Sequence, residues 1–131
     1  GSIVEFQIST SDVVPFDIGP FDIVSDPDGN IWFTEYFRNK IGKISSNGVI
    51  VEFLIPTNDS HPQGITMGPD GNIWFTEINA NKVGRITPNG IITEFPLPAS
   101  NSNPAGITTG PDGNIWFTEY RNNKIGTRII T

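Results

Sequence analysis

The chain contains no cysteine, and only one methionine and one histidine occur among its 131 residues. Without cysteine there is neither a disulfide framework nor a thiolate nucleophile. No apolar run is long enough to span a membrane, and no hydrophobic region of a signal peptide is present. Lysine and arginine form no cluster and the net charge is −6, which argues against nucleic acid as a partner. We therefore expect a soluble protein of unknown compartment, cytoplasmic in a bacterium if it is natural.

Helical periodicity is absent as well, whereas glycine and proline are abundant at 14 and 11 residues. They fall at expected turns rather than in a low-complexity run, which argues against disorder. The chain starts with Gly1-Ser2 instead of methionine. We interpret this dipeptide as a scar of proteolytic cleavage after recombinant expression, so an engineered origin stays open beside a natural one.

What the sequence does contain is a repeat of 42 residues. The stretch Gly68–Glu77 recurs unchanged at Gly110–Glu119, and with Asp for Gly at Asp26–Glu35. The three tryptophans lie at the same place in each copy, 42 residues apart. A fixed period of 20–50 residues is the signature of a repeat architecture.

Each repeat has the pattern of four short strands separated by turns. Pro-Asp-Gly-Asn is a turn sequence, and the Ile-Trp-Phe-Thr that follows is β-branched and aromatic throughout. A second Asn-Gly turn separates two further strands, and a short Gly-Ile-Thr strand precedes the first turn. Four strands at this period are typical of a β-propeller blade. Besides the Ile-Trp-Phe-Thr strands, we expect strands at Lys40–Ile44, Ile50–Leu54, 64–66, Lys82–Ile86, 92–95 and 106–108.

The predicted fold is therefore all-β, a β-propeller segment with three four-stranded blades per chain. An N-terminal strand at 3–8 matches the outermost strand of a blade, and the three blades occupy about 19–56, 61–98 and 103–131. The third blade lacks an outermost strand of its own. We expect the N-terminal strand to supply that strand to another copy of the chain.

The expected partner is thus the chain itself in a head-to-tail homo-oligomer. Ile3–Ile8 of one copy would pair with 124–129 of the next, and such a contact must close into a ring or continue as a fibre. A dimer would have six blades, within the usual four to eight, so we favour it; a trimer with nine is the runner-up.

The repeated string Gly-Pro-Asp-Gly-Asn-Ile-Trp-Phe-Thr-Glu, with Asn-Lys-Ile/Val-Gly-Arg-Ile and Ile-Thr-Glu-Phe-Pro-Leu-Pro after it, resembles the blades of the virginiamycin B lyase (streptogramin lyase) family. The resemblance covers essentially the whole chain and implies a seven-bladed propeller, of which this chain has about three blades. It also implies an elimination reaction that opens a cyclic depsipeptide antibiotic at its ester. In that chemistry a histidine takes the α-proton, and a Mg²⁺ held by glutamates stabilises the developing charge.

Mapped onto this chain by its motif, the resemblance places metal-type glutamates at the end of each Trp-Phe-Thr-Glu, at Glu35, Glu77 and Glu119. The general-base histidine would lie fourteen residues ahead of such a glutamate, where this chain has Phe21, Gln63 and Ala105. The one histidine, His61, lies two residues too early and is a weak catalytic candidate. The expected ligand-facing side chains are Glu35, Glu77, Glu119, His61 and Gln63.

Structural alternatives accompany each of these assignments. The three glutamates would line one face near the channel and could hold a divalent cation, or each could instead accept backbone N–H bonds in its own loop. His61 would otherwise be a solvated loop residue. The tryptophans are interpreted as core between blades, and Asp-Pro-Asp-Gly-Asn as a turn rather than a calcium loop.

Two functions follow from this reading. The first is a self-assembling scaffold or binding module without catalysis of its own, favoured by the missing histidine and by the near-identity of the second and third repeats. The second is a Mg²⁺-dependent lyase of the streptogramin type.

Overall fold

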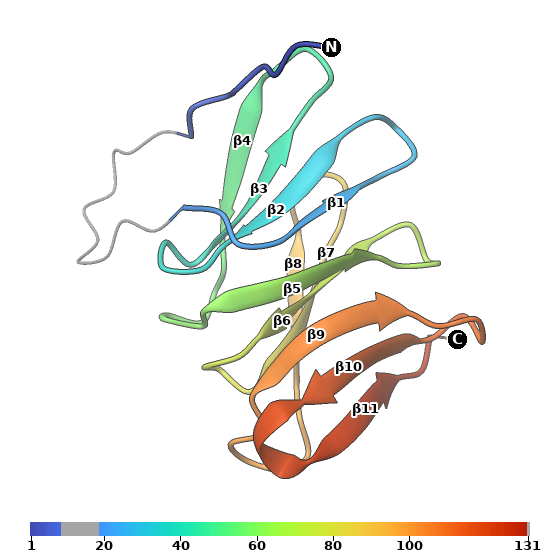
Figure 1. Cartoon of the computed structure of the whole chain (residues 1–131). Helices are drawn as coiled ribbons and strands as arrows, with labels where there is room; N and C mark the ends of the chain where they lie inside the picture. Colours follow the sequence, from blue (N-terminus) through green and yellow to red (C-terminus); the bar gives the residue numbers. More distant parts are fainter. Residues whose placement is uncertain (9–18, 131) are drawn as a thin grey trace.

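A computed structural model describes residues 1–8 and 19–130, and short antiparallel strands make up nearly all of its regular structure (Figure 1). One turn of 3-10 helix, Tyr120–Asn122, interrupts them, and no helix in the described part is long and apolar enough to cross a membrane. The all-β prediction is confirmed. The strands are β1 (Ile23–Ser25), β2 (Ile31–Glu35), β3 (Lys40–Ile44), β4 (Ile50–Leu54), β5 (Pro62–Met67), β6 (Ile73–Glu77), β7 (Lys82–Ile86), β8 (Ile92–Pro96), β9 (Pro104–Thr109), β10 (Ile115–Glu119) and β11 (Lys124–Arg128).

The strands form three sheets, each of which is one propeller blade. Blade one is β1-β2-β3-β4, blade two is β5-β6-β7-β8, and blade three is β9-β10-β11. Strands β3, β4 and β7 have the predicted bounds, while β5, β8 and β9 are longer than predicted. The expectation of three four-stranded blades holds for the first two; blade three has three strands among the described residues.

The repeated Pro-Asp-Gly-Asn is a turn in which the aspartate carboxylate is the organising acceptor. Asp70 accepts the backbone N–H of Asn72 at 3.2 Å and the indole N–H of Trp74 at 3.1 Å. Gly71 has a φ of 84°, a conformation that costs glycine nothing. The turn interpretation is confirmed, and the same carboxylate fixes the orientation of the tryptophan that follows.

Threonine in Ile-Trp-Phe-Thr ties neighbouring blades together. The Thr76 hydroxyl accepts the N–H of Gly64 at 2.9 Å and donates to the carbonyl of Ala105, in blade three, at 2.7 Å. The Thr34 hydroxyl donates in the same way to the carbonyl of Gln63, in blade two, at 2.8 Å. Each junction between blades therefore contains a hydrogen bond that the repeat encodes.

Tryptophan and phenylalanine fill the space between blades from opposite sides. Trp32, 1% exposed, packs with Phe75 and Ile86 of blade two, and Trp74, also 1% exposed, packs with Ile115 and Phe117 of blade three. Because the two side chains project from opposite faces of each strand, one blade contacts both its neighbours. The prediction that tryptophan forms inter-blade core is confirmed for these two, whereas Trp116, in the last blade, is half-buried.

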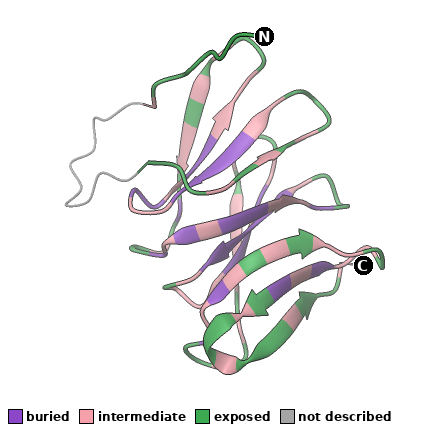
Figure 2. Ribbon diagram, in the orientation of Figure 1, coloured by how far each residue is buried: buried purple, intermediate pink, exposed green. Residues whose placement is uncertain are grey.

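The two ends of this arc contain many exposed residues (Figure 2), and several of them are large and apolar. Residues 3–8 belong to no sheet in the single chain, and Ile3, Val4 and Phe6 are largely exposed. At the other end β11 pairs with β10 alone, and its Ile125 is exposed. The pairing of residues 3–8 with β11 of a second copy therefore stays a prediction.

Candidate functional site

The glutamates that end β2 and β6 are buried, each beside a second glutamate from the outermost strand of its blade. Glu77 is 0% exposed and Glu35 is 2% exposed. Glu94 lies opposite Gly84 in the ladder between β7 and β8. A Cβ at Gly84 would lie 2.3 Å from the Phe75 ring and 2.9 Å from Glu77 Oε2. The glycine of the repeated Lys-Ile/Val-Gly therefore leaves room for the phenylalanine ring and for the first glutamate of the pair.

Burial raises the pKa of Glu77 to about 9, and the neighbouring Glu94 carboxylate adds to the rise. For Glu94, burial acts to raise the pKa. The hydrogen bonds with Glu77 and Thr57 and the charge of Lys82 outweigh burial, so the pKa of Glu94 lies below its ordinary value. No donor among the described residues reaches either carboxyl oxygen of Glu77. A proton held by Glu77 and directed at Glu94 supplies the missing bond.

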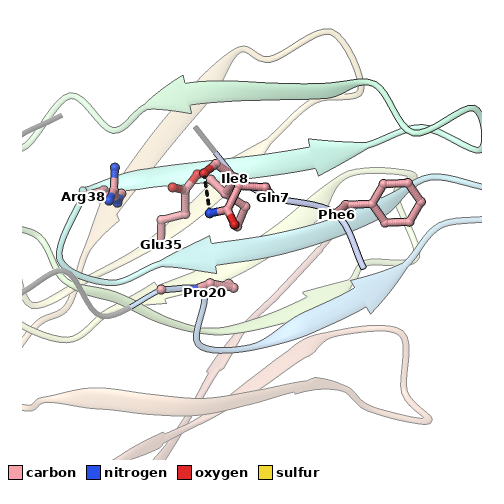
Figure 3. A pocket seen from close by; sticks show the side chains of 7 residues that line it. Phe6, Gln7, Ile8, Pro20, Glu35 and Arg38 are labelled. Carbon is pink, nitrogen blue, oxygen red and sulfur yellow. Dashed lines mark hydrogen bonds between the residues drawn. The ribbon is translucent and has the colours of Figure 1, made fainter. Parts of the chain in front are cut away.

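Blade one has the same arrangement. Burial raises the pKa of Glu35 to about 8, the Glu52 carboxyl adds to the rise, and Lys40 and Arg38 oppose it. Glu35 lines a hollow of about 250 Å³ together with Phe6, Gln7, Ile8, Gly19, Pro20 and Arg38. Figure 3 shows the Glu35 side chain among the labelled members of this lining. The pair of Glu35 and Glu52 in blade one therefore borders this hollow through Glu35.

The three glutamates singled out by sequence, Glu35, Glu77 and Glu119, lie in three different blades. Among residues 1–8 and 19–130, no group of three or more His, Asp or Glu side chains could hold a metal ion together. The carboxyl oxygens of Glu35 and Glu77 find no donor in the described part, so the alternative that each accepts backbone N–H bonds in its own loop is not seen for these two. Glu119 is half-buried beside Gly126, where a Cβ would lie 2.7 Å from its Oε2.

Sequence reasoning missed the second member of each pair, Glu52 and Glu94. A signal for them was present, because Glu-Phe recurs at 5–6, 52–53 and 94–95, in the N-terminal segment and in the last strands of the first two blades. That strand is half-exposed, so its glutamates resemble solvated residues until the ladder places them opposite a glycine.

His61 is in an aromatic cluster between blades one and two rather than in a freely solvated loop. Its ring stacks on Tyr36 at 4.6 Å and meets Phe37 edge-on at 5.7 Å, while Phe21 lies 5.9 Å from Tyr36. Its backbone has a φ of 54°. The cluster places an imidazole on the surface between these two blades.

The positions that correspond to the general base are occupied by backbone-bonded residues. The carbonyl of Gln63 accepts from Thr34 and that of Ala105 accepts from Thr76. The Gln63 side-chain oxygen is buried with no donor within reach in the described part of the chain. No histidine stands at Phe21, Gln63 or Ala105.

The model of the virginiamycin B lyase family matches residues 1–131, the full length of the sequence. The chain belongs to the virginiamycin B lyase family. Among solved structures, the selenomethionine form of virginiamycin B lyase from Staphylococcus aureus is 45% identical with a TM-score of 0.82 over 88% of this chain. A catalytically inactive variant of the S. aureus enzyme with quinupristin is 42% identical with a TM-score of 0.78 over 89%. A streptogramin B lyase is 36% identical with a TM-score of 0.86 over 99%. No curated protein sequence matches.

Membership in the family establishes the propeller blades but not a whole propeller. The chain covers 39%, 43% and 45% of those three structures, which is less than half of each.

Proposed function

We propose that this chain is a self-assembling segment of a lyase-type β-propeller that acts as a structural and binding scaffold. It has no catalysis of its own in this proposal, and its ring is completed by association with identical chains in head-to-tail order. The expected assembly is a dimer with six blades, and the trimer with nine blades is the second choice, since propellers usually have four to eight.

One observation carries the proposal: residues buried between blades inside the chain recur at its two ends, where they are exposed. Ile41 and Ile65 meet between blades one and two and are 0% and 5% exposed. Ile125 in blade three is the counterpart of Ile41 two repeat units on, and Ile23 in blade one is the counterpart of Ile65 one unit back; they are 66% and 65% exposed. Burying such surface stabilises association by about 25 cal/mol per Å².

Light scattering coupled to size-exclusion chromatography tests the proposal. At micromolar concentration the 131-residue chain should have twice its monomer mass of 14.3 kDa, or three times that mass for the trimer. Deletion of residues 1–8 should yield monomer or aggregate, because blade three then has no strand to cover β11. A stable soluble monomer of the intact chain would contradict the proposal.

The second candidate function is a Mg²⁺-dependent lyase acting on streptogramin B antibiotics. The buried carboxyl pairs favour it, because their oxygens become the kind of ligand that Mg²⁺ prefers once the bound ion displaces the proton that each pair holds. Glu35 and Glu52 fit this ion best, since the hollow beside Glu35 leaves space for water ligands. When bound, Mg²⁺ would act as a Lewis acid towards the substrate. The absence of histidine at Phe21, Gln63 and Ala105 weighs against this function.

Incubation with quinupristin and Mg²⁺, followed by mass spectrometry and absorbance, separates the two functions. We expect no opening of the antibiotic ring, because the chain has no base at the mapped positions. Ring opening that is lost in Glu35→Gln would instead establish the lyase. Catalysis that Glu35→Gln leaves intact would point to a contaminating enzyme.

A further inference from the structure

Residues 3–8 already lie on blade one as the last strand of one blade lies on the next. The Phe6 ring covers Gly48, with Cε1 3.0 Å from the place of a Cβ, and the Phe53 ring covers Gly90, with Cε1 2.1 Å from that place. Gly48 and Gly90 belong to the equivalent Asn-Gly turns of blades one and two. The N-terminal segment therefore makes on blade one the contact that β4 makes on blade two.

Ile8, two positions after Phe6, also corresponds to a residue of the internal junction, Ile55. Ile8 and Phe6 line a hollow of about 310 Å³ on blade one together with Ile23, Phe33 and Ile44. Their counterparts inside the chain form the core cluster in which Ile55 packs with Ile65, Phe75 and Ile86. The segment thus occupies the place of the outermost strand of a preceding blade, and what it lacks is a strand to pair with.

Blade three presents the complementary surface, which we call the third-blade edge: the outer side of β11 with Glu119 and Thr118. In blades one and two the corresponding edge pairs Gly42 with Glu52 and Gly84 with Glu94. Transferred by one repeat, this register sets Gly126 opposite Glu5. The place of a Cβ at Gly126 lies 2.7 Å from Glu119 Oε2, as it lies 2.9 Å from Glu77 Oε2 at Gly84.

We propose that the third-blade edge binds residues 3–8 of a second copy of this chain, with Gly126 opposite Glu5 and Thr127 opposite Val4. This inference rests on the proposed self-assembly and adds to it a strand register and a composite site. Glu5 of the second copy lies beside Glu119 in that site, and Lys124, which pairs with Glu119 across β10 and β11, is at the same end.

A second contact follows at the inner side of the blade. The Thr118 hydroxyl accepts the N–H of Gly106 at 2.9 Å, as Thr76 accepts that of Gly64. The Thr76 hydroxyl in turn donates a hydrogen bond to the carbonyl of Ala105 in the next blade. The repeat makes the Phe21 carbonyl of the second copy the matching acceptor for Thr118, so the interface is bonded at both its inner and its outer side.

A second copy is the occupant because its surface carries the counterparts of a junction already built in this chain. Glu5-Phe6-Gln7-Ile8 corresponds to Glu52-Phe53-Leu54-Ile55, and the face behind it offers Ile23, Phe33 and Ile44 where blade two offers Ile65, Phe75 and Ile86. The third-blade edge offers Trp116 and Ile125 where blade one offers Trp32 and Ile41. Both halves of the junction are present on one polypeptide.

Disulfide trapping tests the register, and the chain has no native cysteine to interfere. Val4→Cys with Thr127→Cys puts two thiols directly opposite each other, since β3 and β4 pair Lys43 with Val51. Directly opposed residues of an antiparallel ladder are within the range that a disulfide spans. Ile3→Cys with Thr127→Cys is the matched control, because a shift of one residue directs the two side chains to opposite faces.

Under mild oxidation the first double variant should form a covalent oligomer at least about tenfold faster than the control. Equal rates in both variants, in a chain that light scattering shows to be assembled, would overturn the register and leave self-assembly standing. A disulfide within one chain, found by mass spectrometry of a monomer, would also overturn the inference. If the unsubstituted chain is itself monomeric at the same concentration, both the proposed self-assembly and the strand register inferred here are wrong.

Discussion

Replacing Trp74 by alanine should lower the free energy of unfolding by about 3–5 kcal/mol, the usual cost of truncating a buried aromatic side chain. Trp74 is enclosed between blades two and three and stacks on Phe95 with ring centroids 5.5 Å apart. Its indole N–H also donates to Asp70, so the substitution leaves a cavity and removes one of the hydrogen bonds that this carboxylate accepts. Chemical denaturation followed by circular dichroism measures the effect.

Two further variants separate the packing of Trp74 from general effects of apolar truncation. Leu54→Ala truncates an exposed apolar side chain in β4 and should cost less than about 1 kcal/mol. Trp74→Phe keeps an aromatic ring but loses the bond to Asp70, so its cost should be intermediate. A loss for Trp74→Ala no larger than that for Leu54→Ala would show that the junction between blades two and three is not tightly packed.

Replacing Glu77 by glutamine should make the fold less sensitive to alkaline pH. The folded chain holds the Glu77 proton up to a pKa of about 9, whereas an unfolded glutamate releases it near the ordinary value of 4.5. The stability that this proton confers is complete below about pH 4.5 and is lost as the pH rises towards 9. Glutamine keeps the donor without titrating, so at pH 7 the variant should be more stable by on the order of 2–3 kcal/mol.

The measurement is the unfolding midpoint at a series of pH values between 5 and 9. Glu35 contributes its own slope, since its pKa is raised to about 8, so the double variant Glu35→Gln, Glu77→Gln should be flatter than either single one. Asp28→Asn makes the same carboxyl-to-amide change at an exposed turn and should leave the slope as it is. A parallel slope for Glu77→Gln and Asp28→Asn would refute the buried-proton assignment.

Much of the architecture could be read from local sequence. The 42-residue period, the Pro-Asp-Gly-Asn and Asn-Gly turns, and the strands Lys40–Ile44 and Lys82–Ile86 were all predictable, because turn chemistry and strand propensity act over a few residues. The burial of Trp32 and Trp74 was predictable for a related reason. A large side chain repeated at one place in every blade has to meet the neighbouring blade.

The carboxyl pairs were decided by tertiary structure alone. Glu35 and Glu52 are 17 residues apart in sequence, and only the antiparallel register of β2, β3 and β4 brings them together across Gly42. The same holds for the placement of residues 3–8 on blade one, where Phe6 rests on Gly48. Propensity and turn signals determine which residues become strands, whereas side-chain proximity depends on ladder register and on the stacking of blades. Those contacts join residues far apart in the chain, so no local pattern specifies them.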